Sequence, residues 1–112
     1  MYTTSELERQ IATARASVER NRRLQRLLVN PDFKALIQED YLTTYAKNAL
    51  NVAASLPNNP QREVALNDAL GASSLFNWLQ SVEAIGAREE ARIPGYEEML
   101  AEIRNEEVIQ NG

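Results

Sequence analysis

The short sequence Leu56-Pro57-Asn58-Asn59-Pro60 separates two long segments that both have the apolar spacing of α-helices. Proline lacks a backbone N–H and has a fixed φ, so Pro57 stops the helix that precedes it. Asn59 can cap a new helix, and Pro60 suits the first position of that helix. The stretch therefore predicts a turn between two helices of a hairpin.

The segment before this turn has a similar start signal. Asn30 can cap a helix, Pro31 suits its first position, and the negative charge of Asp32 is favourable at a helix N-terminus. Apolar side chains then recur every three or four residues, which is the spacing of one helix face: they are Phe33, Ile37, Tyr41, Tyr45, Ala49, Ala53 and Leu56. We expect a helix over residues 31–56.

The segment after the turn is expected to be a helix over residues 60–92. Its apolar residues surround much of the helix circumference, so we expect it to be the most buried helix. Phe76 is expected in the core, and Trp78 either in the core or at an interface.

A run of four small residues lies in the middle of this third helix and would let another helix approach closely. We expect its first two members, Gly71 and Ala72, to pack against the face of the second helix that carries Tyr41 and Tyr45. The bodies of these tyrosines are expected to be buried, with each hydroxyl at solvent or at a polar partner.

Ile93-Pro94-Gly95 is expected to be a turn, followed by a short last helix over residues 95–107. The apolar side chains of this helix form one stripe, and its acidic residues include Glu98 and Glu102, one turn apart. The carboxylates of Glu98 and Glu102 could share a cation. Most other acidic pairs are adjacent in the sequence, and adjacent side chains diverge by about 100° around a helix, so they cannot. We therefore predict a solubilising face and no metal site.

Residues 5–29 are expected to form the first helix. A capping box marks its start, formed either by Ser5 with Glu8 or by Thr3 with Glu6. A narrow apolar seam follows at spacings of four, three and four residues, which is typical of a helix that meets a partner helix: it consists of Leu7, Ile11, Ala14 and Val18. From this seam we assign Leu7, Ile11 and Val18 to a protein interface.

These segments predict an all-α protein with one domain over residues 1–112: an elongated hairpin or bundle of three long helices and one short one. The 112 residues include no Cys and no His, which excludes disulfide scaffolds, zinc fingers and Ser-His or Cys-His catalysis. No apolar stretch approaches the ~20 residues of a bilayer span. We therefore expect a soluble, non-enzymatic protein with no cofactor, no catalytic residue and no membrane partner.

Charge is distributed unevenly along the chain. Residues 1–30 carry six arginines and three glutamates, a net charge of +3, whereas residues 61–112 carry four arginines and ten acids, a net charge of −6. The two ends of the chain are therefore complementary, either within one molecule or between subunits, although each exposed pair contributes only ~0–1 kcal/mol.

Four arginines lie within seven residues late in the first helix: Arg20, Arg22, Arg23 and Arg26. They could bind the phosphates of a nucleic acid, or they could be a helix face that pairs with acids such as Glu19. We favour protein association, because the chain is acidic overall and no aromatic residues interleave with these arginines. Arg22 and Arg26, one turn apart, are assigned with Trp78 to the protein interface.

Several of these residues, in this order, resemble a family of small helical proteins of tailed bacteriophages, mostly short-tailed ones, whose genes lie among capsid, portal and packaging genes. The resemblance is carried by Glu6-Leu7-Glu8-x-Gln10-Ile11, Leu24, Asn30-x-Asp32-Phe33-Lys34, Ile37-x-Glu39-x-Tyr41, Asp68-Ala69-Leu70-Gly71-Ala72, Phe76 and Glu97-Glu98-Met99-Leu100. It covers most of the chain and contains no catalytic signature. Pro31 departs from the charged residue expected there, which strengthens the local helix start.

The resemblance implies a bacteriophage structural or particle-assembly protein, located in the virion or in the host cytoplasm during assembly. Its partners would be itself or other particle proteins of the capsid, portal, head–tail connector or tail. The alternative is a DNA-packaging or DNA-binding subunit that uses the basic cluster of residues 20–26.

Overall fold

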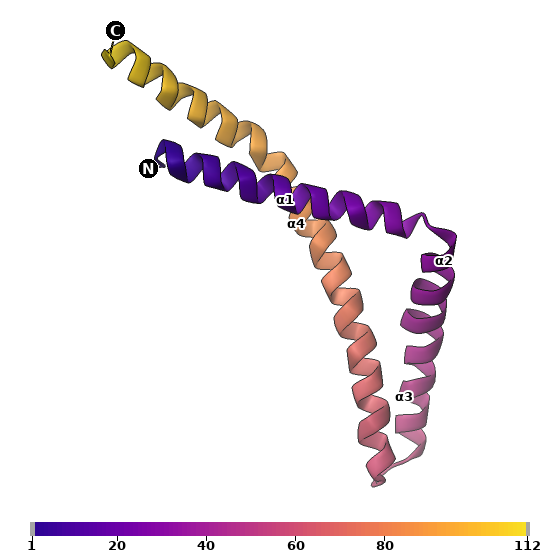
Figure 1. The fold of residues 1–112 in the computed structure, drawn as a ribbon. Helices are drawn as coiled ribbons and strands as arrows, with labels where there is room; N and C mark the ends of the chain where they lie inside the picture. The colour runs from indigo at the N-terminus through magenta and orange to yellow at the C-terminus, as the bar shows by residue number, and fades with distance from the viewer. Residues whose placement is uncertain (1, 112) are drawn as a thin grey trace. The chain divides into compact units, whose positions relative to one another are not determined.

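The computed structural model describes residues 2–111, and these are helical along nearly their whole length (Figure 1). The helices are α1 (Thr4–Leu28), α2 (Pro31–Phe33), η1 (Lys34–Tyr45), α3 (Ala46–Ser55) and α4 (Pro60–Asn111). No strand occurs between residues 2 and 111, which confirms the all-α class. None of the helices in this part of the chain is both long enough and apolar enough to cross a membrane.

α2, η1 and α3 follow one another without a break, so the helix expected over residues 31–56 is one continuous segment, Pro31–Ser55. Its start is as expected: the Asn30 side chain accepts hydrogen bonds from the backbone N–H groups of Asp32, at 2.9 Å, and Phe33, at 3.1 Å. The turn at its end is also confirmed. Asn58 has a left-handed φ of 64°, and the Asn59 side chain accepts from the Gln61 N–H at 2.9 Å.

The middle of this segment, η1, is a π-helix, which the sequence did not predict. The Ala46 N–H reaches the carbonyl of Tyr41, five residues earlier, and the Thr43 hydroxyl donates to the Gln38 carbonyl at 2.9 Å. A turn closed over five residues is wider than an α-turn. Ile37 and Tyr41 lie in this segment, and both are half-buried.

α4 corrects the expectation of two separate helices at 60–92 and 95–107. The residues Ile93-Pro94-Gly95 do not form a turn, and α4 continues through Pro94 to Asn111. The described chain therefore has three long helical segments in place of three long helices and a short one.

α4 continues through Pro94 because its seam of buried and half-buried residues has the same spacing before and after the proline. Buried or half-buried residues recur along α4 at alternating spacings of four and three: Val82, Gly86, Glu89, Ile93, Tyr96, Leu100 and Ile103. An interior proline costs a helix ~3 kcal/mol, and the packing of one continuous face outweighs this cost.

The contacts divide the chain into two compact units. The first contains the residues up to 23 and those from 82 onward, and the second contains residues 24–81. In the first unit α1 and the last part of α4 run side by side and antiparallel (Figure 1). Leu7, Ile11 and Leu100 form the buried core there, and Tyr96 and Ile103 pack against it.

The start of α1 uses one of the two expected capping boxes. The Thr3 hydroxyl accepts from the Glu6 N–H at 3.2 Å, and the Glu6 carboxylate accepts from the Thr3 N–H at 3.0 Å. Glu8 of the other candidate box instead pairs with Arg104 across the unit.

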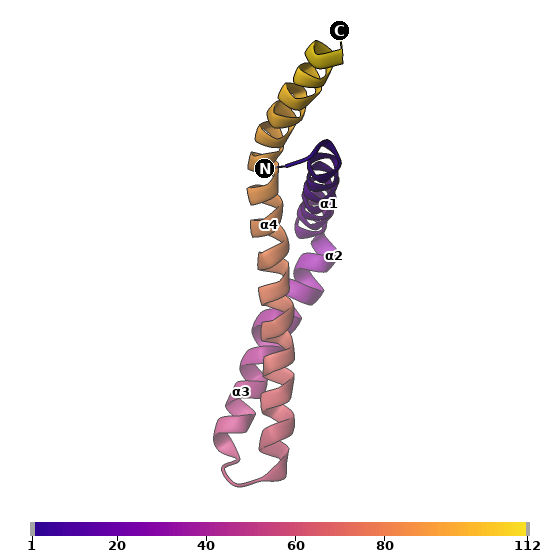
Figure 2. The ribbon, with the colours of Figure 1, turned by 90° about the vertical axis from the view of Figure 1, so that its left-hand side faces the viewer.

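The second unit contains the expected helical hairpin, in which α3 lies beside the first turns of α4 (Figure 2). Its buried side chains on the two helices are small: Ala49, Ala53, Ala65, Ala69 and Ala72. The expectation that the helix from residue 60 is the most buried one is therefore wrong for this part of α4. Phe76, expected in the core, is 47% exposed.

Candidate interaction surfaces

The apolar seam of α1 meets its partner helix within the same chain. Leu7 is 0% exposed, and Ile11 and Val18 are also buried. Leu7 and Ile11 share their core with Leu100 of α4. An interface role for these residues would therefore require α1 and α4 to separate.

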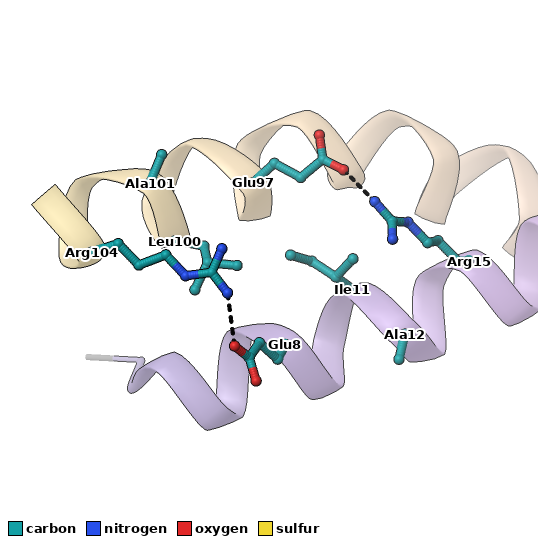
Figure 3. Close-up of a pocket in the computed structure, with 8 residues that line it drawn as sticks. All are labelled: Glu8, Ile11, Ala12, Arg15, Glu97, Leu100, Ala101 and Arg104. Atoms are coloured by element: carbon teal, nitrogen blue, oxygen red, sulfur yellow. Dashed lines mark hydrogen bonds and ion pairs between the residues drawn. The ribbon is translucent and has the colours of Figure 1, made fainter.

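A groove of about 420 Å³ lies between α1 and α4 (Figure 3). Its charged side chains are already paired: Arg15 with Glu97 at 2.7 Å, and Arg104 with Glu8 at 2.8 Å. In this view Ile11 lies between the two ion pairs, and Leu100 lies beside the Arg104–Glu8 pair (Figure 3). The complementary charges of the chain's two ends thus meet within one molecule here, and the groove offers a ligand no unpaired charge.

All four arginines of the basic cluster are exposed. Arg23 approaches Glu19 at 3.7 Å, one turn earlier on the same helix. Arg22 lies with Glu90 along an open groove beside Pro94. Within residues 2–111, Arg20 and Arg22 form no ion pair. The assignment of Arg22 and Arg26 to an interface stays a prediction.

Trp78 is 57% exposed on α4, so the structure places it at the surface and not in the core. Exposed aromatic side chains are frequent anchors of protein interfaces, and Trp78 remains a candidate for that role.

The hairpin carries an apolar groove of about 280 Å³ on one side. Its residues come from α3 and the start of α4, with Tyr45 at the end of η1: Tyr45, Asn48, Ala49, Val52, Gln61, Val64, Ala65 and Asp68. Ala49 and Ala65 are buried, whereas Tyr45, Val52 and Val64 are about half exposed.

A second hollow continues this groove along η1, because the two share Tyr45 and Asn48. It adds Leu36, which is 61% exposed, together with Asp40, Tyr41 and Thr44. We call the two hollows together the hairpin groove. The sequence pattern does not indicate this groove, because Leu36 and Val52 lie outside the i, i+4 stripe of residues 33–56 and Val64 lies on the other helix.

Tyr45 links the two helices of the hairpin at this groove. Its ring stacks on Tyr41 with centroids 5.8 Å apart, and its hydroxyl donates to an Asp68 carboxylate oxygen at 3.0 Å. The hydrogen bond to Asp68 and the negative charge of Asp68 raise the pKa of Tyr45 above its ordinary value. The expected polar partner of a tyrosine hydroxyl is thus present, although Tyr45 itself is 47% exposed and not buried.

Gly71 lies beside Tyr41, as expected from the sequence. A Cβ atom on Gly71 would lie 3.7 Å from the Tyr41 hydroxyl oxygen, an ordinary contact distance, and Ala72 is buried.

Among the described residues, no group of three or more acidic side chains is placed to hold a metal ion, and Glu98 and Glu102 belong to none. Comparison of the chain with protein-family models, with curated proteins and with solved structures finds no match.

Proposed function

We propose that this chain is a non-enzymatic structural or assembly protein that acts by association with other protein surfaces. One observation carries the proposal: the hairpin buries alanines in its interior and leaves large apolar side chains, such as Leu36, Val52 and Val64, exposed. A buried methylene or methyl group contributes only ~0.8 kcal/mol, whereas fixing one residue's backbone costs ~1–2 kcal/mol. Exposed apolar patches of this kind typically mark interaction surfaces.

The chemistry of the side chains supports a binding role over a catalytic one. The chain has no His and no Cys, the residues that most often act as base or nucleophile near neutral pH. The charged residues of the α1–α4 groove are engaged with one another. Association therefore uses the groups that the surface offers, which are apolar side chains and arginines.

We place this association in the particle of a tailed bacteriophage, or in its assembly, at the capsid, portal or head–tail region. The support is the resemblance of the residue pattern, together with a small helical subunit suited to repetition in a symmetric assembly. Mass spectrometry of purified mature particles beside procapsids tests the setting. We expect peptides of this chain in at least one of the two, and their absence from both would contradict a particle role.

The alternative is a DNA-packaging or DNA-binding subunit. The observation that favours it is the exposure of Arg20 and Arg22 without an ion pair within residues 2–111. If these arginines bind phosphate, changing both to Gln reduces the salt slope of duplex binding by about 0.9 per lost contact, on any DNA sequence. Duplex binding at or below a micromolar Kd at ~0.15 M salt would favour this alternative.

A further inference from the structure

We propose that the hairpin groove of one copy binds the exposed arginine stripe on α1 of a second copy of this chain. The arginine stripe consists of Ala16, Arg20, Arg23 and Leu27. This inference rests on the proposed function of association, and it adds the identity of the partner and the two surfaces that meet.

The four residues of the arginine stripe lie on one face of α1. Their spacings of four, three and four residues keep them on one side of an α-helix, and all four are exposed. Arg20 follows the buried Val18 by two residues, which is about 200° around the helix. The stripe thus lies opposite the seam that packs against α4 and is accessible to another molecule.

The hairpin groove matches this stripe in charge. Of the residues that line the two hollows, the charged ones are Asp40 and Asp68, and both are acidic. The Asp68 carboxylate is held in place by the Tyr45 hydroxyl at 3.0 Å. Guanidinium groups bind carboxylates in a planar, often bidentate geometry, so Arg20 and Arg23 suit these two acids.

The apolar parts also correspond. Leu27 is 46% exposed at the end of the stripe, and the walls of the groove are apolar at Leu36, Val52 and Val64. Arg20 and Arg23 are three residues apart, ~4.5 Å along the helix axis. Asp40 and Asp68 each line a hollow that also contains Tyr45, and Tyr45 binds Asp68, so both acids border the groove near this residue. Arg20 and Arg23 have long side chains, and each is proposed to pair with one of these acids.

Pairing of two hairpin grooves with each other is disfavoured by the same charges. It would bring Asp40 and Asp68 of both copies into one interface, and no lysine or arginine lines the groove. Like charges brought together at an interface weaken association. A basic helix is the better occupant, and α1 of a second copy supplies one.

Binding of a stripe to a groove is head-to-tail, because each copy carries one of each surface. Contacts of this kind produce a ring where the rotation closes and a filament where it does not. Either product repeats the subunit, as a component of a symmetric particle requires.

The test uses two charge-reversed full-length variants. The stripe variant is Arg20→Glu with Arg23→Glu, and the groove variant is Asp40→Lys with Asp68→Lys. Sedimentation velocity measures association at ~0.05 M and ~0.5 M salt, because exposed charges are screened more strongly at the higher value. We expect the wild type to associate more strongly at low salt, and each variant alone to associate at least about tenfold more weakly.

A mixture of the two variants decides the assignment. In the mixture the acidic stripe of one variant faces the basic groove of the other, and the remaining stripe and groove are unchanged. We expect the mixture to regain the salt-dependent association of the wild type. Failure of the mixture to associate, or wild-type association of either variant alone, would overturn the inference.

Matched controls reverse a charge of the same sign on the same helices. The control for the stripe is Arg9→Glu, which changes an exposed arginine on the same face of α1, eleven residues before Arg20. The control for the groove is Glu39→Lys, which changes an exposed acid that is next to Asp40 in the sequence but does not line the groove. Both are expected to associate like the wild type. Loss of association in either control would show that net charge, and not the assigned surfaces, determines the result.

Two further measurements keep the inference separate from the proposed function. Circular dichroism checks that each variant is helical, and Asp40→Lys alone replaces the double groove variant if loss of the Tyr45 bond unfolds it. A wild type that stays monomeric at high micromolar concentration overturns the inference. The proposed function is overturned only if the wild type is monomeric and is also absent from both phage particles and procapsids.

Discussion

Gly86 allows α4 to pass close to α1 at Asn21. A Cβ atom on Gly86 would lie 2.4 Å from the Asn21 Cβ and 3.0 Å from its Cγ. The backbone fixes both Cβ positions, so the two helices would have to move apart. We expect Gly86→Ala to lower the free energy of unfolding by about 1–3 kcal/mol in urea denaturation, although alanine is the better helix former.

Gly95 provides the matched control for this substitution, because it lies in the same helix and a Cβ there would meet nothing within 4 Å. We expect Gly95→Ala to raise the free energy of unfolding by about 0.5–1 kcal/mol through helix propensity. Equal stabilisation by the two substitutions would contradict the close approach at Asn21.

Tyr45 should make stability depend on pH in the alkaline range. Its hydrogen bond to Asp68 and the charge of Asp68 raise its pKa above the ordinary value of 10.0. The bond requires a protonated hydroxyl, so its contribution is fully present below the ordinary pKa and is lost as pH rises through the raised one. We expect unfolding midpoints of the wild type to fall above pH ~10, and those of Tyr45→Phe to fall less.

At the scale of elements, the pairing of α1 with α4 depends on apolar side chains far more than on ion pairs. Ile11 is 6% exposed within the core, whereas Arg15 and Glu97 pair at side chains that are about half exposed or more. We expect Ile11→Ala to lower the free energy of unfolding by about 2–5 kcal/mol and Glu97→Gln by no more than about 1 kcal/mol. Urea denaturation measures both, and a larger effect of Glu97→Gln would contradict this order.

The sequence predicted the helix starts well, because caps are local. Asn30, Asn59 and the Thr3–Glu6 pair all bond the backbone as expected. It did not predict the continuity of α4, because Pro94 is a local stop signal and the packing that overrides it comes from the partner helix. The regular spacing of the seam from Val82 to Ile103 is visible in the sequence. The seam stabilises α4 only because α1 packs against it.

The hairpin groove shows what single-helix patterns leave out. The i, i+4 stripe correctly marked Ala49 and Ala53 as buried. Which flanking residues form a groove depends on both helices and on the wider turns of η1, so the juxtaposition of Val52 and Val64 was not visible in either segment. Of the assigned interface residues, Trp78 is at the surface, and Leu7, Ile11 and Val18 are buried within the chain.

At the scale of the whole molecule, the two units differ in what they bury. The first has Leu7, Ile11 and Leu100 in its core, each of which can contribute about 1.5–3 kcal/mol when buried. The buried side chains on the two helices of the hairpin are alanines, which contribute less. The first unit therefore has its own source of stability, and under the proposed association the hairpin would gain further burial from a partner.

This difference predicts that stability depends on protein concentration, and that the dependence is located in the hairpin. A partner that binds only the folded state stabilises it by mass action, by about 2.7 kcal/mol at a hundredfold excess over Kd. We expect the Tm from circular dichroism to rise between about 2 and about 200 μM protein. Amide hydrogen exchange at the same two concentrations should slow along α3 and change little at Leu7 and Ile11, which serve as the internal control. A Tm that is independent of concentration, with α3 amides as well protected as those of the α1 seam, would show that the hairpin is stable alone and needs no partner.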